Sequence, residues 1–122
     1  MGLQLAIISN TFSPRSVLDR QLEHFDLIRF FSVRTYSSET VYRKPDRRIF
    51  QATLSKLGAT AAEAVMVGDR EREDIKGARR LGIRTIWKRG TTNSHLNIEK
   101  ADAVIESIGE LPRLIERWRE QV

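Results

Sequence analysis

An apolar run that ends abruptly in Gly68-Asp69 constrains the fold more than any other feature of the sequence. The run 65–67 is typical of a strand that is buried in a parallel sheet. Gly68 lets the chain turn sharply at the carboxyl end of that strand. Asp69 then lies where open α/β sheets bind their ligands, in the crevice beyond the strand tips. Asp74 follows about one helical turn later and can lean back toward the same point.

The two carboxylates have two interpretations. If they converge at the strand tip, they suit a hard cation such as Mg²⁺, which prefers oxygen ligands. Alternatively, Asp69 caps the following helix and Asp74 is a solvated helix residue, because Asp is common at N-caps. The spacing by itself does not decide between them.

Two further segments favour the first interpretation. The apolar run 5–8 predicts another strand, and this strand ends in a hydroxyl and an amide, those of Ser9 and Asn10. The segment 43–46, Arg-Lys-Pro-Asp, opens a predicted helix whose apolar side chains share one face: Ile49, Phe50, Leu54 and Leu57. The chain therefore offers a strand-end Ser, then Lys44 before a helix, then a strand-end Gly-Asp with a second Asp five residues later.

This order and spacing, from about residue 3 to 120, resemble the haloacid dehalogenase superfamily of phosphohydrolases. The resemblance implies that Ser9 and Asn10 donate hydrogen bonds to a phosphate. It implies that Lys44 is catalytic, neutralising the phosphate and orienting a nucleophile, since lysine binds phosphate as a point charge. The resemblance also implies that Asp69 and Asp74 form a Mg²⁺ site. In that site Asp69 ligates the ion, and Asp74 holds Lys44 or a metal-bound water. The implied ligand is a phosphorylated small molecule, and phosphoryl transfer needs this combination of positive charge and metal.

The sequence departs from the family in one respect. Members begin with a strand that bears Asp-x-Asp, whose first Asp is the nucleophile and whose second is the general acid/base. The sequence contains no Asp-x-Asp, and Asp19 and Asp26 do not end an apolar strand, so neither is assigned as nucleophile. We expect a core without its first strand and cap, and no turnover from the chain by itself. The cap selects the substrate in this family, so the substrate is not predicted.

Three other functions are weighed against the enzyme. A pseudoenzyme would keep the phosphate and metal site without turnover, and a basic interaction module would merely use the fold. A bacterial receiver domain also combines Asp, Lys and Mg²⁺, but its Lys follows the phosphorylated Asp in the sequence. Lys44 precedes Asp69 here, which counts against that class.

Composition narrows the partners. A chain of 122 residues suits a single domain over 1–122. The net charge is +5, but the basic residues are scattered and aromatic residues do not interleave with them, so nucleic acid is not an expected partner. No apolar run is long enough for a bilayer and no signal-peptide pattern occurs, so a cytoplasmic protein without a membrane partner is expected. The sequence has no Cys, and His24 and His95 are read as ordinary surface or loop residues.

Alternating elements predict an α/β fold, a Rossmann-like three-layer sandwich with a mostly parallel sheet. Strands are expected at about 3–9, 31–36, 64–68, 83–87 and 103–105, the second of them short and more exposed. Helices are expected after a Ser13-Pro14 cap, from Asp46 to Gly58, over 71–81, and where apolar residues recur at 111, 114, 115 and 118. Thr60 and Glu63 have capping-box spacing. The polar loop 88–100 is the candidate for mobility.

The family places a further strand between those that end at Ser9 and Asp69. Unpaired backbone groups in a buried sheet are not tolerable. Three alternatives stay open: the two strands pair directly, another chain fills the gap, as in a homodimer, or the sequence is a cropped or decayed protein. We slightly favour direct pairing, because it needs no partner. Ser9, Lys44 and Asp69 should then lie at the same sheet edge.

Overall fold

The computed structural model describes residues 2–90 and 100–121. The strands of this part of the chain are β1 (Leu5–Ser9), β2 (Phe31–Tyr36), β3 (Val65–Gly68), β4 (Arg84–Lys88) and β5 (Ala103–Ile105). The α-helices there are α1 (Arg15–His24), α2 (Arg47–Leu57), α3 (Gly77–Arg79) and α4 (Leu111–Glu120). Contacts divide the chain into two compact units, Met1–Ala64 (unit 1) and Val65–Val122 (unit 2). The single domain expected over 1–122 stays a prediction.

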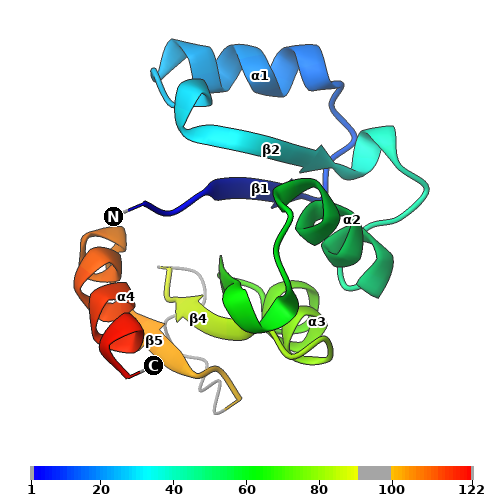
Figure 1. Ribbon diagram of the computed structural model, residues 1–122. Helices are drawn as coiled ribbons and strands as arrows, with labels where there is room; N and C mark the ends of the chain where they lie inside the picture. Colours follow the sequence, from blue (N-terminus) through cyan, green and yellow to red (C-terminus); the bar gives the residue numbers. More distant parts are fainter. Residues whose placement is uncertain (1, 91–99, 122) are drawn as a thin grey trace. The chain divides into compact units, whose positions relative to one another are not determined.

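Unit 1 is built on a two-stranded parallel sheet of β1 and β2, in which Ser9 is paired with Tyr36 (Figure 1). Helix α2 packs on both strands. The buried side chains of unit 1 come from β2 and α2: Thr35, Tyr36, Ile49, Phe50 and Thr53. The expectation that 31–36 is short and more exposed was wrong, because β2 is longer than β1 and ends in two buried residues.

Helix α2 begins and ends as the sequence predicts. The Asp46 carboxylate accepts a hydrogen bond from the Arg48 backbone N–H, and so satisfies one of the unpaired donors of the first turn. Gly58 ends the helix at φ 67°, a left-handed conformation that costs glycine little. The cap predicted at Ser13 was wrong: Pro14 is the cap residue, and it has no side-chain donor or acceptor to offer. The peptide bond between Lys44 and Pro45 is cis.

Unit 2 is a three-stranded parallel sheet in the order β3-β4-β5 (Figure 1). The central strand β4 contributes the buried residues Thr85, Ile86 and Trp87, and the register sets Trp87 beside Gly68 on β3. The Asp102 carboxylate accepts the Thr85 backbone N–H at 2.8 Å and an Arg79 N–H at 3.2 Å. The first bond ties the start of β5 to β4, and the second ties it to α3. The predicted amphipathic helix at the carboxyl end is α4, whose apolar stripe is half-buried.

The helix expected over 71–81 is irregular. Its first part, Glu71–Lys76, is a π-helix (η4), and only Gly77–Arg79 is α-helical. The Ile75 N–H reaches back five residues to the Arg70 carbonyl at 3.2 Å, while the Asp74 N–H bonds the same carbonyl at 3.0 Å. A π-turn inserts one extra residue into the helical ladder. The result here is that Asp74 and Ile75 are both buried.

Within the part of the chain that the structure describes, the strands that end near Ser9 and Asp69 belong to different units, so their direct pairing stays a prediction. The structure pairs β1 with β2 and β3 with β4, in two separate sheets. The homodimer stays untested. In the same part of the chain, no helix is both long and apolar enough to cross a bilayer. The prediction for His95 and most of the mobility prediction for 88–100 lie outside the described residues, whereas His24 is exposed on α1 as expected.

Candidate functional site

The unit 1 part of the site is organised by Asn10, which follows β1 directly. Its Oδ1 accepts the Lys44 backbone N–H at 2.8 Å, and its Nδ2 donates to the Lys44 carbonyl at 2.9 Å. The carboxamide thus binds both main-chain groups of one residue, 34 positions further along the chain. The structure therefore brings the strand end at Ser9 together with the segment that carries Lys44.

A second pair of hydrogen bonds ties the same loop to the end of β2. The Thr11 N–H donates to Ser37 Oγ at 2.8 Å, and that hydroxyl donates back to the Thr11 carbonyl at 3.1 Å. Because the loop after Ser9 is bound at two consecutive residues, its course is fixed without help from a ligand. One of the two Asn10 amide hydrogens is engaged by Lys44, and its predicted bond to phosphate would need the other.

An ion pair between Asp46 and Arg48 follows Lys44 closely along the chain. Arg48 holds the pKa of Asp46 at about 2, first through its side-chain hydrogen bonds and then through its backbone N–H. The guanidinium binds both carboxylate oxygens, at 3.0 and 2.7 Å, and lies 4.1 Å from the centre of the Tyr42 ring. Asp46 therefore stays ionised at neutral pH and anchors the start of α2, directly after the Lys44 segment.

A second charged cluster attaches α1 to β2. Asp19 Oδ1 accepts hydrogen bonds from Arg34 Nε at 3.0 Å and from the Tyr36 hydroxyl at 2.8 Å. Burial opposes ionisation of Asp19, but these two bonds outweigh it and lower the pKa of the carboxyl. The pKa of Tyr36 is raised by burial and by its bond to Asp19. This arrangement explains why Asp19 is no candidate nucleophile: its carboxylate holds α1 against the sheet.

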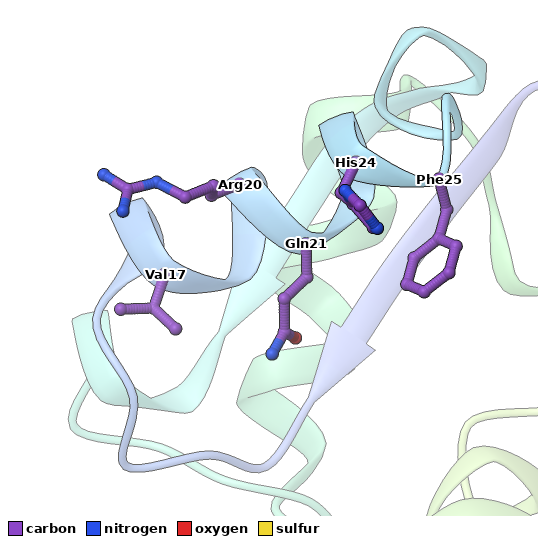
Figure 2. A pocket seen from close by; sticks show the side chains of 5 residues that line it. All are labelled: Val17, Arg20, Gln21, His24 and Phe25. Atoms are coloured by element: carbon purple, nitrogen blue, oxygen red, sulfur yellow. The ribbon is translucent and has the colours of Figure 1, made fainter.

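The shallow pocket on α1 is a separate feature of unit 1. Figure 2 shows the side chains that line it, Val17, Arg20, Gln21, His24 and Phe25. None of the predicted site residues is among them, and it offers no carboxylate for a metal.

The unit 2 part of the site is organised around Asp69. The side chain of Asp74 is turned inward, and its Oδ2 accepts the backbone N–H groups of Asp69 and Arg70, both at 3.1 Å. The Trp87 indole N–H donates to the Asp69 carbonyl at 3.1 Å. Asp74 is buried, whereas Asp69 is exposed. Gly68 is required for this close approach, because a Cβ there would lie 2.5 Å from Cβ and Cγ of Asp74.

The carboxylates fit a magnesium ion as part of its coordination. No group of three or more His, Cys, Asp or Glu able to hold a metal occurs in residues 2–90 and 100–121. Magnesium does not need such a cage, because it keeps several waters and takes one or two carboxylates together with phosphate oxygens. Asp69 offers an exposed carboxylate on a fixed main chain, while one oxygen of Asp74 is engaged by backbone N–H groups.

The site residues stay a prediction from the sequence, which did not predict the hydrogen bonds that hold two of them. Ser9, Asn10 and Lys44 belong to unit 1, Asp69 and Asp74 to unit 2, and the convergence of the two groups stays a prediction. The Asn10 bonds to Lys44 and the Trp87 bond to Asp69 were not predicted. Trp87 lies in an ordinary apolar strand, and only the register with β3 shows its role.

The chain belongs to a family of hydrolases, as comparison with known proteins shows. The sequence model of the haloacid dehalogenase-like hydrolase family matches residues 1–88. This confirms the resemblance inferred from Ser9, Lys44 and Asp69, and the α/β fold with parallel sheets that it implied. The chain is a phosphatase-like core of this family.

Individual relatives agree with the family. The phosphoserine phosphatase of Thermus thermophilus is 38% identical over 89 residues, which cover 70% of this chain and 34% of that protein. The crystal structure of a haloacid dehalogenase-type phosphatase from Thermococcus onnurineus is 29% identical with a TM-score of 0.75, and the match covers 84% of this chain and 46% of that one. A magnesium-bound hydrolase of this type from Bacillus subtilis shares the fold, at 22% identity and a TM-score of 0.80, over 93% of this chain and 49% of that one. The chain thus spans between a third and a half of these relatives.

Proposed function

We propose that the chain forms the phosphate- and magnesium-binding part of a phosphohydrolase and does not turn over phosphate esters by itself. The observation that carries this proposal is the double hydrogen bond from Asn10 to the main chain of Lys44. It joins the strand-end hydroxyl of Ser9 to the only lysine that the family pattern assigns to phosphate. A phosphohydrolase must hold a dianionic group, and this arrangement provides a hydroxyl donor and a cation on a pre-formed loop.

The residues would act as follows. Ser9 donates a hydrogen bond to a phosphate oxygen, and Lys44 offsets the charge of the phosphate. Asp69 holds magnesium, and Asp74 keeps the Asp69 loop in place through its bonds to two backbone N–H groups. When bound, the ion would offset the repulsion between carboxylate and phosphate. The magnesium in the Bacillus subtilis relative supports this assignment.

Turnover is not expected because the sequence contains no Asp-x-Asp. Positioning a phosphate cannot by itself replace the covalent intermediate that divides the reaction into two easier steps. A phosphate-binding pseudoenzyme has the same site, and it differs only in that no partner or longer form of the protein restores turnover.

The test separates binding from turnover. We expect no hydrolysis of an aryl phosphate above a metal-only background, but binding of inorganic phosphate in the presence of Mg²⁺, measured by calorimetry. Lys44→Met should weaken that binding about tenfold or more, whereas Lys56→Met, which removes an exposed charge from the last turn of α2, should not. Robust hydrolysis abolished by Asp69→Asn would contradict the proposed inactivity. Equal phosphate affinity of the two lysine variants would contradict the assigned site.

A further inference from the structure

Trp87 is a buried residue of unit 2 whose polar group binds the main chain of Asp69. Its side chain is 1% exposed, and its indole N–H donates to the Asp69 carbonyl at 3.1 Å. The parallel register accounts for this contact, because Trp87 is paired with Gly68, the residue directly before Asp69. An indole has one donor and no acceptor, and a buried donor without a partner is costly. The Asp69 carbonyl is therefore the partner that lets a tryptophan occupy this place.

The three hydrogen bonds around Asp69 act on two consecutive peptide groups. The peptide group before Asp69 is held through its N–H by Asp74. The peptide group after Asp69 is held at both ends, its carbonyl by Trp87 and its N–H by Asp74. The φ and ψ angles of a residue are set by the orientations of its two flanking peptide groups. The backbone conformation of Asp69, and hence the direction of its Cα–Cβ bond, is fixed from outside the residue.

We propose that Trp87 is a positioning residue for Asp69: its indole N–H fixes the peptide group after Asp69 so that the carboxylate is presented to a divalent cation. The inference rests on the proposed function in that the cation is the expected ligand of Asp69. Small errors in a ligand's position weaken a metal site strongly, so a residue that does not touch the ion can still set its affinity.

A purely structural role for Trp87 predicts something different. Trp87 also packs in the core of unit 2 with Ile75 and Ala101. If packing were its whole contribution, Trp87→Phe would lower the stability of the unit uniformly. Ile86→Val is the matched control, since it trims a fully buried neighbour on the same strand and leaves the hydrogen bonds of Asp69 in place.

Amide hydrogen exchange, followed by NMR on the metal-free chain, tests the positioning role. In Trp87→Phe the amides of Asp69 and Arg70 should exchange about tenfold faster than in Ile86→Val, after both are corrected for the change in global stability. The amides of Thr85 and Ile86 should show no such difference. Equal exchange at Asp69 and Arg70 in the two variants would overturn the proposal.

Mn²⁺ titration tests the consequence for the site. Paramagnetic broadening of the signals near Asp69 should give a Kd about tenfold weaker in Trp87→Phe than in Ile86→Val, and Asp69→Asn should abolish it. If the wild-type chain binds no Mn²⁺, the proposed metal site fails, while the exchange experiment still decides the role of Trp87. An unchanged Kd in Trp87→Phe overturns the inference and leaves the metal site standing.

The wild-type chain provides a measurement that no folding defect can spoil. The Trp87 indole hydrogen should exchange at the same opening rate as the amides of Asp69 and Arg70, because all three open together. Fast exchange of that indole hydrogen while both amides stay protected would overturn the proposal.

Discussion

The backbones of Lys44 in unit 1 and of Asp69 in unit 2 are both fixed by hydrogen bonds from other side chains, but these side chains differ in kind. Lys44 is held by a neutral carboxamide, Asn10, which is partly buried and lies 34 residues away. Asp69 is held by a buried carboxylate five residues away and by an indole 18 residues away. In each unit the side chain that would meet the ligand takes no part in the hydrogen bonds that hold its own backbone.

The difference predicts how each part of the site fails. A buried, charged acceptor that serves two donors is worth more than a neutral one, and its loss leaves both donors unpaired. Breaking the unit 2 arrangement should therefore lower stability more than breaking the unit 1 arrangement. Breaking the unit 1 arrangement should instead lower mainly the affinity for the ligand.

The largest effect is expected for Asp74→Ala. The variant removes a buried carboxylate and leaves the partly buried N–H groups of Asp69 and Arg70 without their acceptor, so the free energy of unfolding should fall by about 2–4 kcal/mol. Urea denaturation measures this change. Asp74→Asn keeps one acceptor oxygen of the same shape and should lose about half as much. A loss below about 1 kcal/mol in Asp74→Ala would remove the contrast between the units.

Gly68→Ala should have the next largest effect on stability. The added Cβ would lie 2.5 Å from Cβ and Cγ of Asp74, and the resulting shift should cost about 1–3 kcal/mol. Gly109→Ala is the control, since a Cβ there would make an ordinary contact of 3.5 Å with Ser107 Oγ. Thermal unfolding of the two variants should differ accordingly. Equal melting temperatures would show that the loop at Asp69 can move aside freely.

Asn10→Ala should have a smaller effect on stability and a clear effect on binding. Two hydrogen bonds at a partly buried place are lost, and the free energy of unfolding should fall by about 1–2 kcal/mol. Affinity for inorganic phosphate should drop, because the Lys44 segment is no longer fixed. Gln21→Ala, which removes an exposed amide on α1, is the control for both measurements. If Asn10→Ala loses more stability than Asp74→Ala, the comparison between the units is reversed.

The smallest effect concerns pH and unit 1. The pKa of Asp46 is lowered from 3.8 to about 2 by Arg48, so the folded state favours the ionised form. The stabilisation is fully present above the unfolded pKa and is lost as pH falls from about 4 to about 2. Asp46→Asn keeps the cap acceptor and removes the charge, so its difference from the wild type should shrink over this range. A difference in stability between the two proteins that stays constant from pH 5 to pH 2 would show that the pair of Asp46 with Arg48 does not stabilise the fold.

The sequence predicted those features that depend on neighbouring residues. The strand ends at Ser9 and Gly68, the start of a helix after Asp46, its end at Gly58 and the capping box of Thr60 with Glu63 all follow from local patterns, and the structure confirms them. The inward orientation of the Asp74 side chain also depends on neighbouring residues, since it binds the N–H groups of Asp69 and Arg70. The π-turn over 71–76 was missed, because Ile75 is the single apolar residue of this segment and one residue carries no spacing that would reveal an insertion.

The features that were missed require contacts between distant segments. The bonds from Asn10 to Lys44 depend on where α2 starts relative to the end of β1, and the Trp87 bond depends on the register of β3 with β4. Neither leaves a pattern in the sequence, since an Asn after a strand and a Trp within one are both ordinary. The direct pairing of β1 with β3 stays a prediction for the same reason, because strand order is a property of the whole chain.

The span of 34 residues between Asn10 and Lys44 also has a kinetic consequence. Closing a long loop costs entropy that must be overcome before its contacts form, whereas the five-residue link from Asp69 to Asp74 closes early and cheaply. Contacts made after the folding barrier affect mainly the unfolding rate. Asn10→Ala should thus shorten the lifetime of the folded state and leave its rate of formation nearly unchanged. The contact between the loop after Ser9 and the Lys44 segment would be the last part of unit 1 to assemble and the first to come apart.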